Sequence, residues 1–460
     1  MSPLKQSGLG DNFYLHGYDI SGDINSIGTI SGAMSPLDVT GIDKSAYERI
    51  GGSRSGDIEF TAYFNDATSR AHPRLSTLPT TDVHLYYARG TTLANPAACM
   101  VGKQINYDGT RGDDGDFKFA VQAQCNGFGI EWGKQLTAGK RTDTGATNGT
   151  AAAFGFSSED FLLIDGTSGD YASTPDAASL DITGDIDLRV RVSMDDWTPA
   201  AEQTLIAKYT VTGNQRSYAL AVTATGALIF RWSEDGTAEK SETSSAVNTF
   251  TNGTTHWVRA TLDVNNGGGD AAVDFYTSED GSTWTALGAQ QLNGATTSIF
   301  ASTAVLELGS QTGGTVNRLA GKIFRAEVLS GIGGTSVAAP IASTSSNGIT
   351  DATPLTWTVQ GNAIISSHTN YGGQAYLQVF SFAGTDATVK LQHSYNNSTF
   401  ADITGGGFTQ ITSGPTAERI ATSSTLEIRR YVRAVTTTSG GFTSLVFAVM
   451  FTNNITATTF

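Results

Sequence analysis

The sequence is poor in cysteine and has no long apolar run. Cys99 and Cys125 are the only cysteines in 460 residues, which excludes a disulfide scaffold; both lie in strand-like segments, where buried thiols are expected rather than a bridge. No run of 18 apolar residues is present, so no transmembrane span or membrane insertion is expected. The opening MSPLKQSGLGD lacks the apolar core of a signal peptide, so synthesis in a cytoplasm is expected.

Basic residues are scarce as well. Lys and Arg total 28 against 43 Asp and Glu, a net charge of −15, which argues against a protein that grips duplex nucleic acid through clustered cations. The excess is uneven: residues 151–340 hold ten basic and 22 acidic side chains, residues 1–150 hold 13 and 16, and residues 341–460 hold five of each. This step in charge and the chain length predict several domains.

Glycine, threonine, serine and alanine are abundant, with 53 glycines. Short alternating segments between turn signals predict an all-β protein with domains over 1–150, 155–335 and 345–460. Small polar stretches at 144–157 and 333–350 are interpreted as linkers. Little helix is expected: one short helix over 69–78 and a helical turn over 43–50.

The first third is organised around residues 40–65. Ile58, Phe60, Ala62 and Phe64 alternate with polar residues, which is the pattern of a half-buried strand. The Gly-rich segment NSIGTISG (25–32) has few charges, so it could pair with a strand of a neighbouring subunit; the alternative is an ordinary loop.

Seven stretches carry a resemblance to a known family: DISGDINSIGTISG (19–32), DVTGIDKSAYERIGG (38–52), IEFTAYFN (58–65), AHPRLSTLPTTDV (71–83), ARGTTLANPAA (88–98), KQINYD (103–108) and FAVQAQCNGFGIEWGKQLTAGKRTDT (119–144). They resemble the major tail (tail tube) proteins of long-tailed, siphovirus-type bacteriophages of actinobacteria. The resemblance implies a β-sandwich-type domain, the first of three in the chain, with the tail-tube fold and one short helix. It also implies that six copies form a ring and that the rings stack into a tube. It also implies a virion location, contacts with tape measure, tail terminator and baseplate proteins, and DNA that passes without specific binding.

Several motifs in this third are interpreted as structural. The RGD tripeptide at 111–113 lies in a turn and is attributed to chance. Four aspartates could collect calcium but lack the helix–loop–helix spacing, so a solvated hairpin turn is expected: Asp108, Asp113, Asp114 and Asp116. Three histidines have no nucleophile or metal ligand nearby in sequence and are expected to be packed or surface residues: His16, His72 and His84.

Residues 155–335 resemble the laminin-G/concanavalin-like (LamG) jelly-roll family. The resemblance rests on DYASTPDAASLDITGDIDLRVRV (170–192), QTLIAKY (203–209), RSYALAVTATGALIFRWSEDG (216–236), HWVRATLDVNN (256–266), VDFYTSEDGSTWTAL (273–287) and LAGKIFRAEVLSG (319–331). Ile186, Leu188, Val190 and Val192 alternate with polar residues, which predicts a half-buried strand. The fold hosts lectins, hydrolases and spacers, so it implies no single function.

Two kinds of candidate site residue occur in this domain. Trp197 and Trp232 are weak candidates for stacking on a host glycan, whereas Trp257 and Trp284 are expected to fill the core. A retaining hydrolase needs two carboxylates on one strand near a cleft. Asp185 and Asp187 have the same-face spacing, but they are interpreted as solvated edge charges.

Residues 345–460 resemble the C-terminal β-sandwich that accompanies the same phage proteins, which implies a decoration domain with the LamG-like domain inserted before it. FYTSEDGSTWTAL (275–287) and LQHSYNNSTFADI (391–403) align and predict one hairpin device used twice. The segment 444–451 is apolar on both faces, as in a strand buried on both sides. Strand alternation places Arg429 and Arg433 on one face and Arg430 on the other, so the three form no coherent basic patch.

Together these features predict a virion structural protein: a homohexameric tail tube subunit around a DNA-conducting channel, with outward-facing decoration domains. No catalytic residue, cofactor or metal site is expected, and the protein is not expected to be an enzyme. The alternative is a tail-associated adhesin that makes weak contact with host surface glycan through the LamG-like domain.

Overall fold

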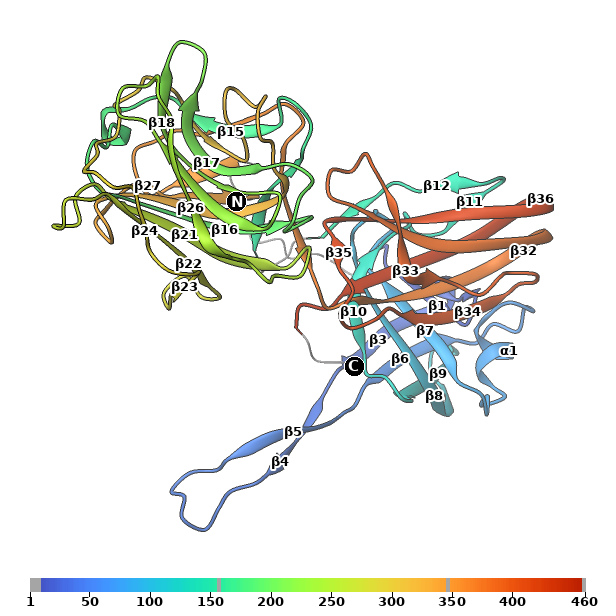
Figure 1. The fold of residues 1–460 in the computed structure, drawn as a ribbon. Coiled ribbons are helices and arrows are strands. Elements are labelled where there is room, and N and C mark those ends of the chain that lie inside the picture. The colour runs from blue at the N-terminus through green and yellow to red at the C-terminus, as the bar shows by residue number, and fades with distance from the viewer. Residues whose placement is uncertain (1–9, 155–158, 345–347, 457–460) are drawn as a thin grey trace. The chain divides into compact units, whose positions relative to one another are not determined.

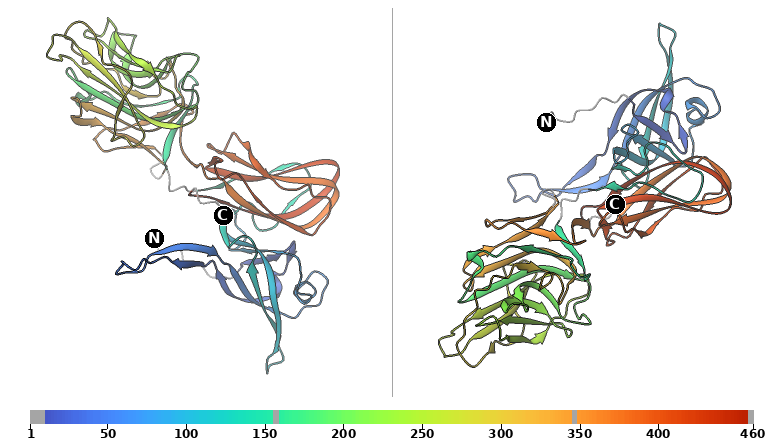
Figure 2. Two further views of the ribbon diagram at one scale, coloured as in Figure 1. Left: turned by 60° about the horizontal axis from the view of Figure 1, so that its bottom comes forward. Right: turned by 90° about the horizontal axis from the view of Figure 1, so that it is seen from above.

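The computed structural model describes residues 10–154, 159–344 and 348–456. Strands make up 55% of the chain and helices 2%, which confirms the all-β prediction. The chain divides into two compact units: unit 1 consists of Met1–Ser158 and His368–Phe460, and unit 2 of Glu159–Ser367 (Figures 1 and 2). The first and last thirds, which the sequence suggested as separate domains, thus lie in one unit.

The N-terminal part of unit 1 contains these elements: β1 (Asn12–Leu15), β2 (Tyr18–Asp19), the 3-10 helix η1 (Ser21–Asp23), β3 (Ile24–Ser31), β4 (Met34–Asp38), β5 (Arg49–Arg54), β6 (Asp57–Tyr63), α1 (Ala71–Leu75), β7 (Val83–Ala88), β8 (Pro96–Arg111), β9 (Phe117–Cys125), β10 (Glu131–Gln135), β11 (Arg141–Asp143), β12 (Thr147–Asn148) and β13 (Ala152–Ala153). The C-terminal part contains β32 (Gly373–Ser394), β33 (Ala401–Gly407), β34 (Thr416–Ala421), β35 (Ile428–Arg429) and β36 (Tyr431–Asn453).

Strand β36 joins the two parts of unit 1. It pairs with β32 along most of its length and also with β10, β11, β12 and β13 from the N-terminal part. The linker predicted at 144–157 is therefore wrong for its described residues, because 147–148 and 152–153 lie in the ladder. Small polar residues can join a sheet in this way because the ladder uses backbone groups, which every residue except proline supplies in full.

Unit 1 has an apolar core in each part and a third cluster that connects them. In the N-terminal core β6 points Ile58, Phe60 and Ala62 inward, as its alternation predicted, whereas Phe64 follows the strand and is 43% exposed. The connecting cluster contains residues from both parts: Tyr14, Tyr86, Ala88, Ala97, Cys99, Val101, Tyr376, Ala448 and Met450. Cys99 is buried and Cys125 half-buried, and both are free thiols, as expected.

Close backbone approach fixes this connection. Gly17 has a φ of +82°, and a Cβ there would lie 2.5 Å from the Val379 carbonyl oxygen, so the position requires glycine. The Gly17 N–H donates to Gln378 Oε1 at 2.6 Å, while Gln378 Nε2 donates to the His84 carbonyl at 3.2 Å. The two parts of unit 1 are therefore held by polar contacts as well as by apolar packing.

Unit 2 contains β14 (Asp160–Asp165), β15 (Tyr171–Thr174), the 3-10 helix η2 (Ala178–Leu180), β16 (Ile186–Met194), β17 (Gln203–Thr210), β18 (Gln215–Val222), β19 (Ala227–Trp232), β20 (Lys240–Val247), β21 (Thr255–Asp263), β22 (Ala272–Ser278), β23 (Thr285–Ala286), β24 (Gln291–Leu292), β25 (Leu306–Leu308), β26 (Ala320–Ser330), β27 (Thr335–Ala338), β28 (Pro340–Ser343), β29 (Gly348–Asp351) and β30 (Thr358–Gln360). Strand β31 (Ile364–Thr369) begins in unit 2 and pairs there with β14.

Unit 2 is a β-sandwich. One sheet has the order β22-β21-β16-β26-β14-β31 and the other β20-β19-β18-β17-β25-β15-β30, with the apolar core between them. The predicted alternation on β16 is confirmed, because Ile186, Leu188, Val190 and Val192 are fully buried. The linker predicted at 333–350 is wrong for its described residues: β27 and β28 extend the sheet beside β26.

One turn device occurs three times, in SEDGS (278–282), SYNNS (394–398) and SEDGT (233–237). In each, the serine hydroxyl donates to the Asp or Asn two residues on, at 2.9 to 3.2 Å. That side chain in turn accepts two backbone N–H groups, so it caps the turn. Gly281 and Asn397 have positive φ, as the predicted hairpin requires.

Asp187 is not the solvated edge charge that the sequence suggested. Strand β16 is central, between β21 and β26, and Asp187 is fully buried. Its carboxylate accepts hydrogen bonds from Arg189 and Arg259 at 2.8 to 3.2 Å. Burial opposes ionisation, but these bonds outweigh it and hold the pKa of Asp187 below its ordinary value. Asp185 accepts the Val264 N–H at 2.9 Å, so neither carboxylate is free.

Replacing Asp187 by alanine should therefore destabilise unit 2 by about 3 kcal/mol, because two guanidinium groups lose their shared counter-ion. Asp274→Ala is the matched control: Asp274 accepts only an exposed hydrogen bond, from Gln290, and the expected change is below about 0.5 kcal/mol. Urea unfolding followed by tryptophan fluorescence measures both. Equal midpoints for the two variants would contradict the assigned role of Asp187.

Candidate functional site

Strands β4 and β5 form a two-stranded hairpin, called the arm here, that pairs with no other described strand. The arm extends away from the rest of the N-terminal part of unit 1 (Figure 1). Leu37 lies opposite Ile50 in its ladder, and Thr40 Oγ1 accepts the Glu48 N–H at 2.8 Å. The predicted helical turn over 43–50 is wrong, because this pairing makes the chain a strand from Arg49 onward.

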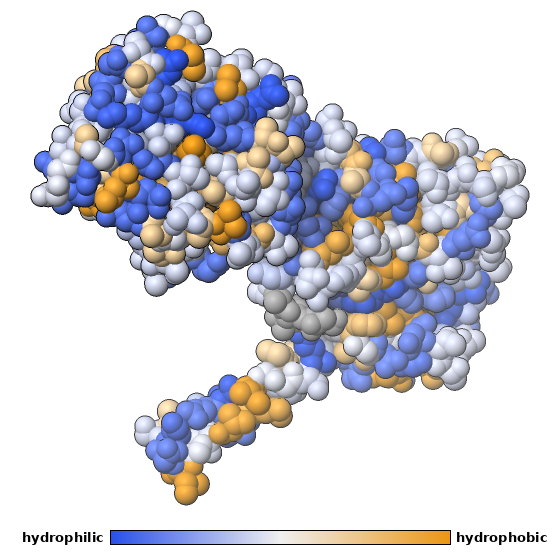
Figure 3. All heavy atoms as spheres, in the orientation of Figure 1, coloured by the Kyte–Doolittle hydropathy of each residue, from blue (hydrophilic) through white to orange (hydrophobic). Residues whose placement is uncertain are grey.

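The arm carries large apolar side chains that remain largely exposed in the described part of the chain. Their exposed fractions lie between 48% and 109%: Met34, Leu37, Val39, Ile42, Tyr47 and Ile50. Figure 3 shows apolar, orange patches on the arm among polar residues. An isolated two-stranded hairpin is marginally stable in water, and contiguous exposed apolar surface marks interaction sites. The arm is therefore a candidate surface for association.

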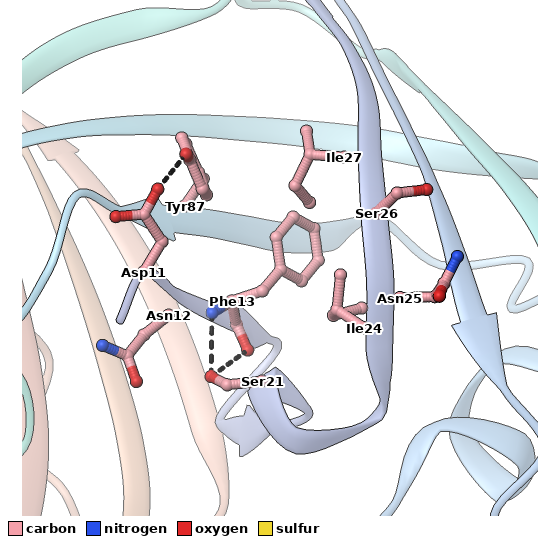
Figure 4. Close-up of a pocket in the computed structure, with 9 residues that line it drawn as sticks. All are labelled: Asp11, Asn12, Phe13, Ser21, Ile24, Asn25, Ser26, Ile27 and Tyr87. Atoms are coloured by element: carbon pink, nitrogen blue, oxygen red, sulfur yellow. Dashed lines mark hydrogen bonds between the residues drawn. The ribbon is translucent and has the colours of Figure 1, made fainter. Parts of the chain in front are cut away.

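A second candidate surface is the gap between β1 and β3. Strand β3 pairs on one side only, with β6, among the described residues, so backbone groups of NSIGTISG remain open on the other side. A cavity of about 340 Å³ lies beside this edge. Figure 4 shows the Phe13 ring pointing toward Ile24 and Ile27, with Asn25 and Ser26 directed outward. The gap therefore has an apolar floor and a polar rim.

Hydrogen bonds fix the rim of this gap. Tyr87 donates its hydroxyl proton to Asp11, which also accepts the Gly90 N–H at 3.0 Å (Figure 4). Burial and the nearby carboxylate raise the pKa of Tyr87 to about 12. Ser21 Oγ accepts the Phe13 N–H at 2.9 Å, so a side chain takes the place of a strand partner on β1. No side chain among the described residues covers the edge of β3 in this way.

The tryptophans proposed to bind glycan are both buried. Trp197 is 1% exposed and Trp232 is not exposed, so neither offers a free ring face. Trp257 is buried, as expected, but its register places it beside Arg191 on the outer face of the sheet. Trp284 is half-buried and lies over Arg189 and Arg259, at 5.7 and 5.4 Å from the guanidinium carbons, rather than in the core.

Several of the aspartates and histidines singled out in the sequence contact other side chains of the protein. Among the described residues no three His, Cys, Asp or Glu side chains are close enough to hold a metal ion; of the four aspartates, Asp116 pairs with Lys118. His72 Nδ1 lies 3.0 Å from the Tyr107 hydroxyl. The rings of His16 and His84 lie 5.6 Å apart. No helix in the described part of the chain is long and apolar enough to cross a membrane.

Comparison with known proteins yields structural likeness alone. No protein-family model matches the chain, and no curated protein matches it. Similar solved structures include the Ruminococcus gnavus IT-sialidase CBM40 bound to α2,3-sialyllactose (15% identity, 38% of this chain and 92% of that chain, TM-score 0.26). Domains LG4-5 of the mouse laminin α1 chain match with 10% identity over 67% of this chain and 92% of that chain, at a TM-score of 0.29. The Dit protein of SPP1, a hub adsorption apparatus protein, matches with 12% identity over 65% of this chain and 96% of that chain, at a TM-score of 0.18. With TM-scores below 0.5, these likenesses carry no conclusion about this chain.

The half-buried histidines His16 and His84 make the stability of unit 1 depend on pH. Burial first, and then the neighbouring His16 and Arg419, lower the pKa of His84 from 6.5 to about 4, against the opposite effect of Asp82; burial also lowers the pKa of His16. The unfolded chain therefore binds protons before the native chain does. Stability should be intact above pH 6.5 and fall by about 2 kcal/mol as the pH decreases to about 4.

Thermal unfolding between pH 7 and pH 4 measures this loss. His84→Gln should flatten the profile of unit 1. His256→Gln, a substitution of the same kind in unit 2, should leave the unit 1 profile unchanged. A His84→Gln profile as steep as that of the unaltered chain would contradict the prediction.

Proposed function

We propose that this chain is the major tail tube subunit of a long-tailed bacteriophage. Hexameric rings of the subunit stack around a channel for DNA, and unit 2 decorates the outside. The role is structural rather than catalytic. Tape measure, tail terminator and baseplate proteins are the expected partners, and the virion tail is the expected location.

The observation that carries the proposal is the arm. Six large apolar side chains on a hairpin of one chain are exposed to water, which favours a partner that covers them. In a tube made of identical subunits every copy supplies that partner, so one sequence feature serves every contact. The open edge of β3 supports the same conclusion, since unpaired backbone groups accept a strand from a neighbouring copy.

The charge of the first third agrees with a conduit for DNA. Its 13 basic and 16 acidic residues are interspersed along residues 1–150, and several basic side chains are neutralised by partners. Lys103 pairs with Asp82 at 2.8 Å and Arg89 with Asp11 at 3.2 Å. A wall of this kind holds phosphates weakly, because affinity for DNA grows with the number of phosphates neutralised.

A charged substitution on the arm tests its role in tube assembly. Val39→Asp should raise the protein concentration needed for tube formation at least about tenfold, because a carboxylate would be buried in the contact. Val247→Asp is the matched control: Val39 is 48% exposed and Val247, in unit 2, is 49% exposed. Negative-stain electron microscopy of the purified protein reports rings and tubes.

Circular dichroism confirms that both variants remain folded. Abundant tubes from Val39→Asp at the concentration used for the control would contradict the proposed role of the arm in assembly. If the unaltered chain stays monomeric at high concentration, the proposal that it forms a tube is contradicted.

Unit 2 should be dispensable for assembly. Asp160 and Ser367 are register partners in adjacent strands, so the chain enters and leaves unit 2 at points about 5 Å apart. Excision of 159–367 with a short Gly-Ser linker should leave a folded unit 1 that still forms tubes of smaller outer diameter. If the shortened chain folds but forms no tube, unit 2 is part of the tube wall.

The adhesin remains the second candidate function. Burial of Trp197 and Trp232 removes the residues first proposed for it. Any glycan contact through unit 2 would therefore use other side chains.

A further inference from the structure

Unit 2 carries two pairs of arginines on the outer face of one sheet, in neighbouring rows. In the first row Arg189 of β16 is the register partner of Arg259 on β21. In the next row Arg191 of β16 is the register partner of Arg325 on β26. Like charges placed directly opposite each other across a ladder destabilise a sheet, so each pair needs a compensating anion.

The first pair has its anion built in. Asp187 lies fully buried beneath Arg189 and Arg259 and accepts two hydrogen bonds from each. Glu327, the register partner of Arg189 on β26, adds a second carboxylate at 3.3 Å. The two cations are thus matched by two carboxylates.

The second pair lacks this compensation. Arg191 pairs with Glu159, whereas Arg325 is exposed and makes no ion pair among the described residues. Arg325 lies 5.9 Å from the Trp257 ring, and Trp257 is the register partner of Arg191 on its other side. Lys322 is on the same face of β26, over the Phe161 ring at 5.3 Å. One net positive charge therefore remains in this row, beside an aromatic ring.

We propose that Arg191 and Arg325, flanked by Trp257, bind a carboxylate or phosphate group of a sparsely charged acidic glycan. The bound anion would be the counter-ion of Arg191 and Arg325, as Asp187 is the counter-ion of Arg189 and Arg259. Two planar guanidinium groups present parallel N–H donors, which match both kinds of anion. The surrounding residues 151–340 carry ten basic and 22 acidic side chains, so a densely charged polyanion is repelled while an isolated anionic group is accepted.

The proposal does not depend on tube assembly, and its test uses the full chain. Titration calorimetry at low salt would compare an oligosaccharide that alternates glucuronic acid with neutral sugars, a neutral oligosaccharide that carries a single glycerol phosphodiester, and neutral maltohexaose. Binding of the first assigns a sugar carboxylate, and binding of the second assigns a phosphodiester. Either should weaken as salt is added, while maltohexaose should not bind.

Arg325→Gln should weaken binding of the active probe about tenfold, through loss of a charge-assisted pair. The variant breaks no ion pair among the described residues and relieves the like-charge contact with Arg191, so its thermal midpoint should not fall. Arg318→Gln removes the same charge from an exposed residue in the loop before β26 and should bind as the unaltered chain does. Two results would overturn the proposal: neither acidic probe binds, or Arg325→Gln binds as tightly as Arg318→Gln.

Discussion

The ladder of β36 is the constraint on which unit 1 depends. Strands β11, β12 and β13 pair with this strand alone, and they are only two or three residues long. Such short polar segments bury little apolar surface, so backbone hydrogen bonds to β36 determine their position. The same strand contributes Ala448 and Met450 to the cluster that connects the two parts. Strand pairing and apolar packing between the two parts of unit 1 thus both depend on β36.

A buried ion pair also connects the N-terminal and C-terminal parts of unit 1. Arg419 of β34 donates to Glu131 of β10 at 2.6 and 2.9 Å, and both side chains are largely buried. In unit 2, Asp187 plays a comparable part by matching two arginines on neighbouring strands. Both networks are local counter-ion arrangements within a chain whose net charge is strongly negative. Their value lies in orientation, because a buried ion pair adds little net stability but tolerates few alternative geometries.

Period-2 patterns allowed prediction of the strands but not of their long-range partners. The alternation of Ile186 to Val192 correctly predicted which face of β16 is buried. The same rule applied to Leu228, Phe230 and Trp232 would have placed Trp232 in the core, so this signal was available and was not used. Asp187 is different: alternation points it outward, and Arg189, Arg259 and the Gly333 N–H cover its carboxylate. Likewise, no local pattern reveals that residues 147–153 pair with β36.

The order of synthesis gives the ladder of β36 a further consequence. Unit 2 is continuous in sequence and is complete before β32 and β36 exist, whereas unit 1 is interrupted by it. Domains generally fold as units as they leave the ribosome. The N-terminal strands β11 to β13 therefore stay unpaired until the segment Tyr431–Asn453, which forms β36, emerges. A chain that terminates before β36 would keep these edges open, so the incomplete protein should aggregate or be degraded in the cell.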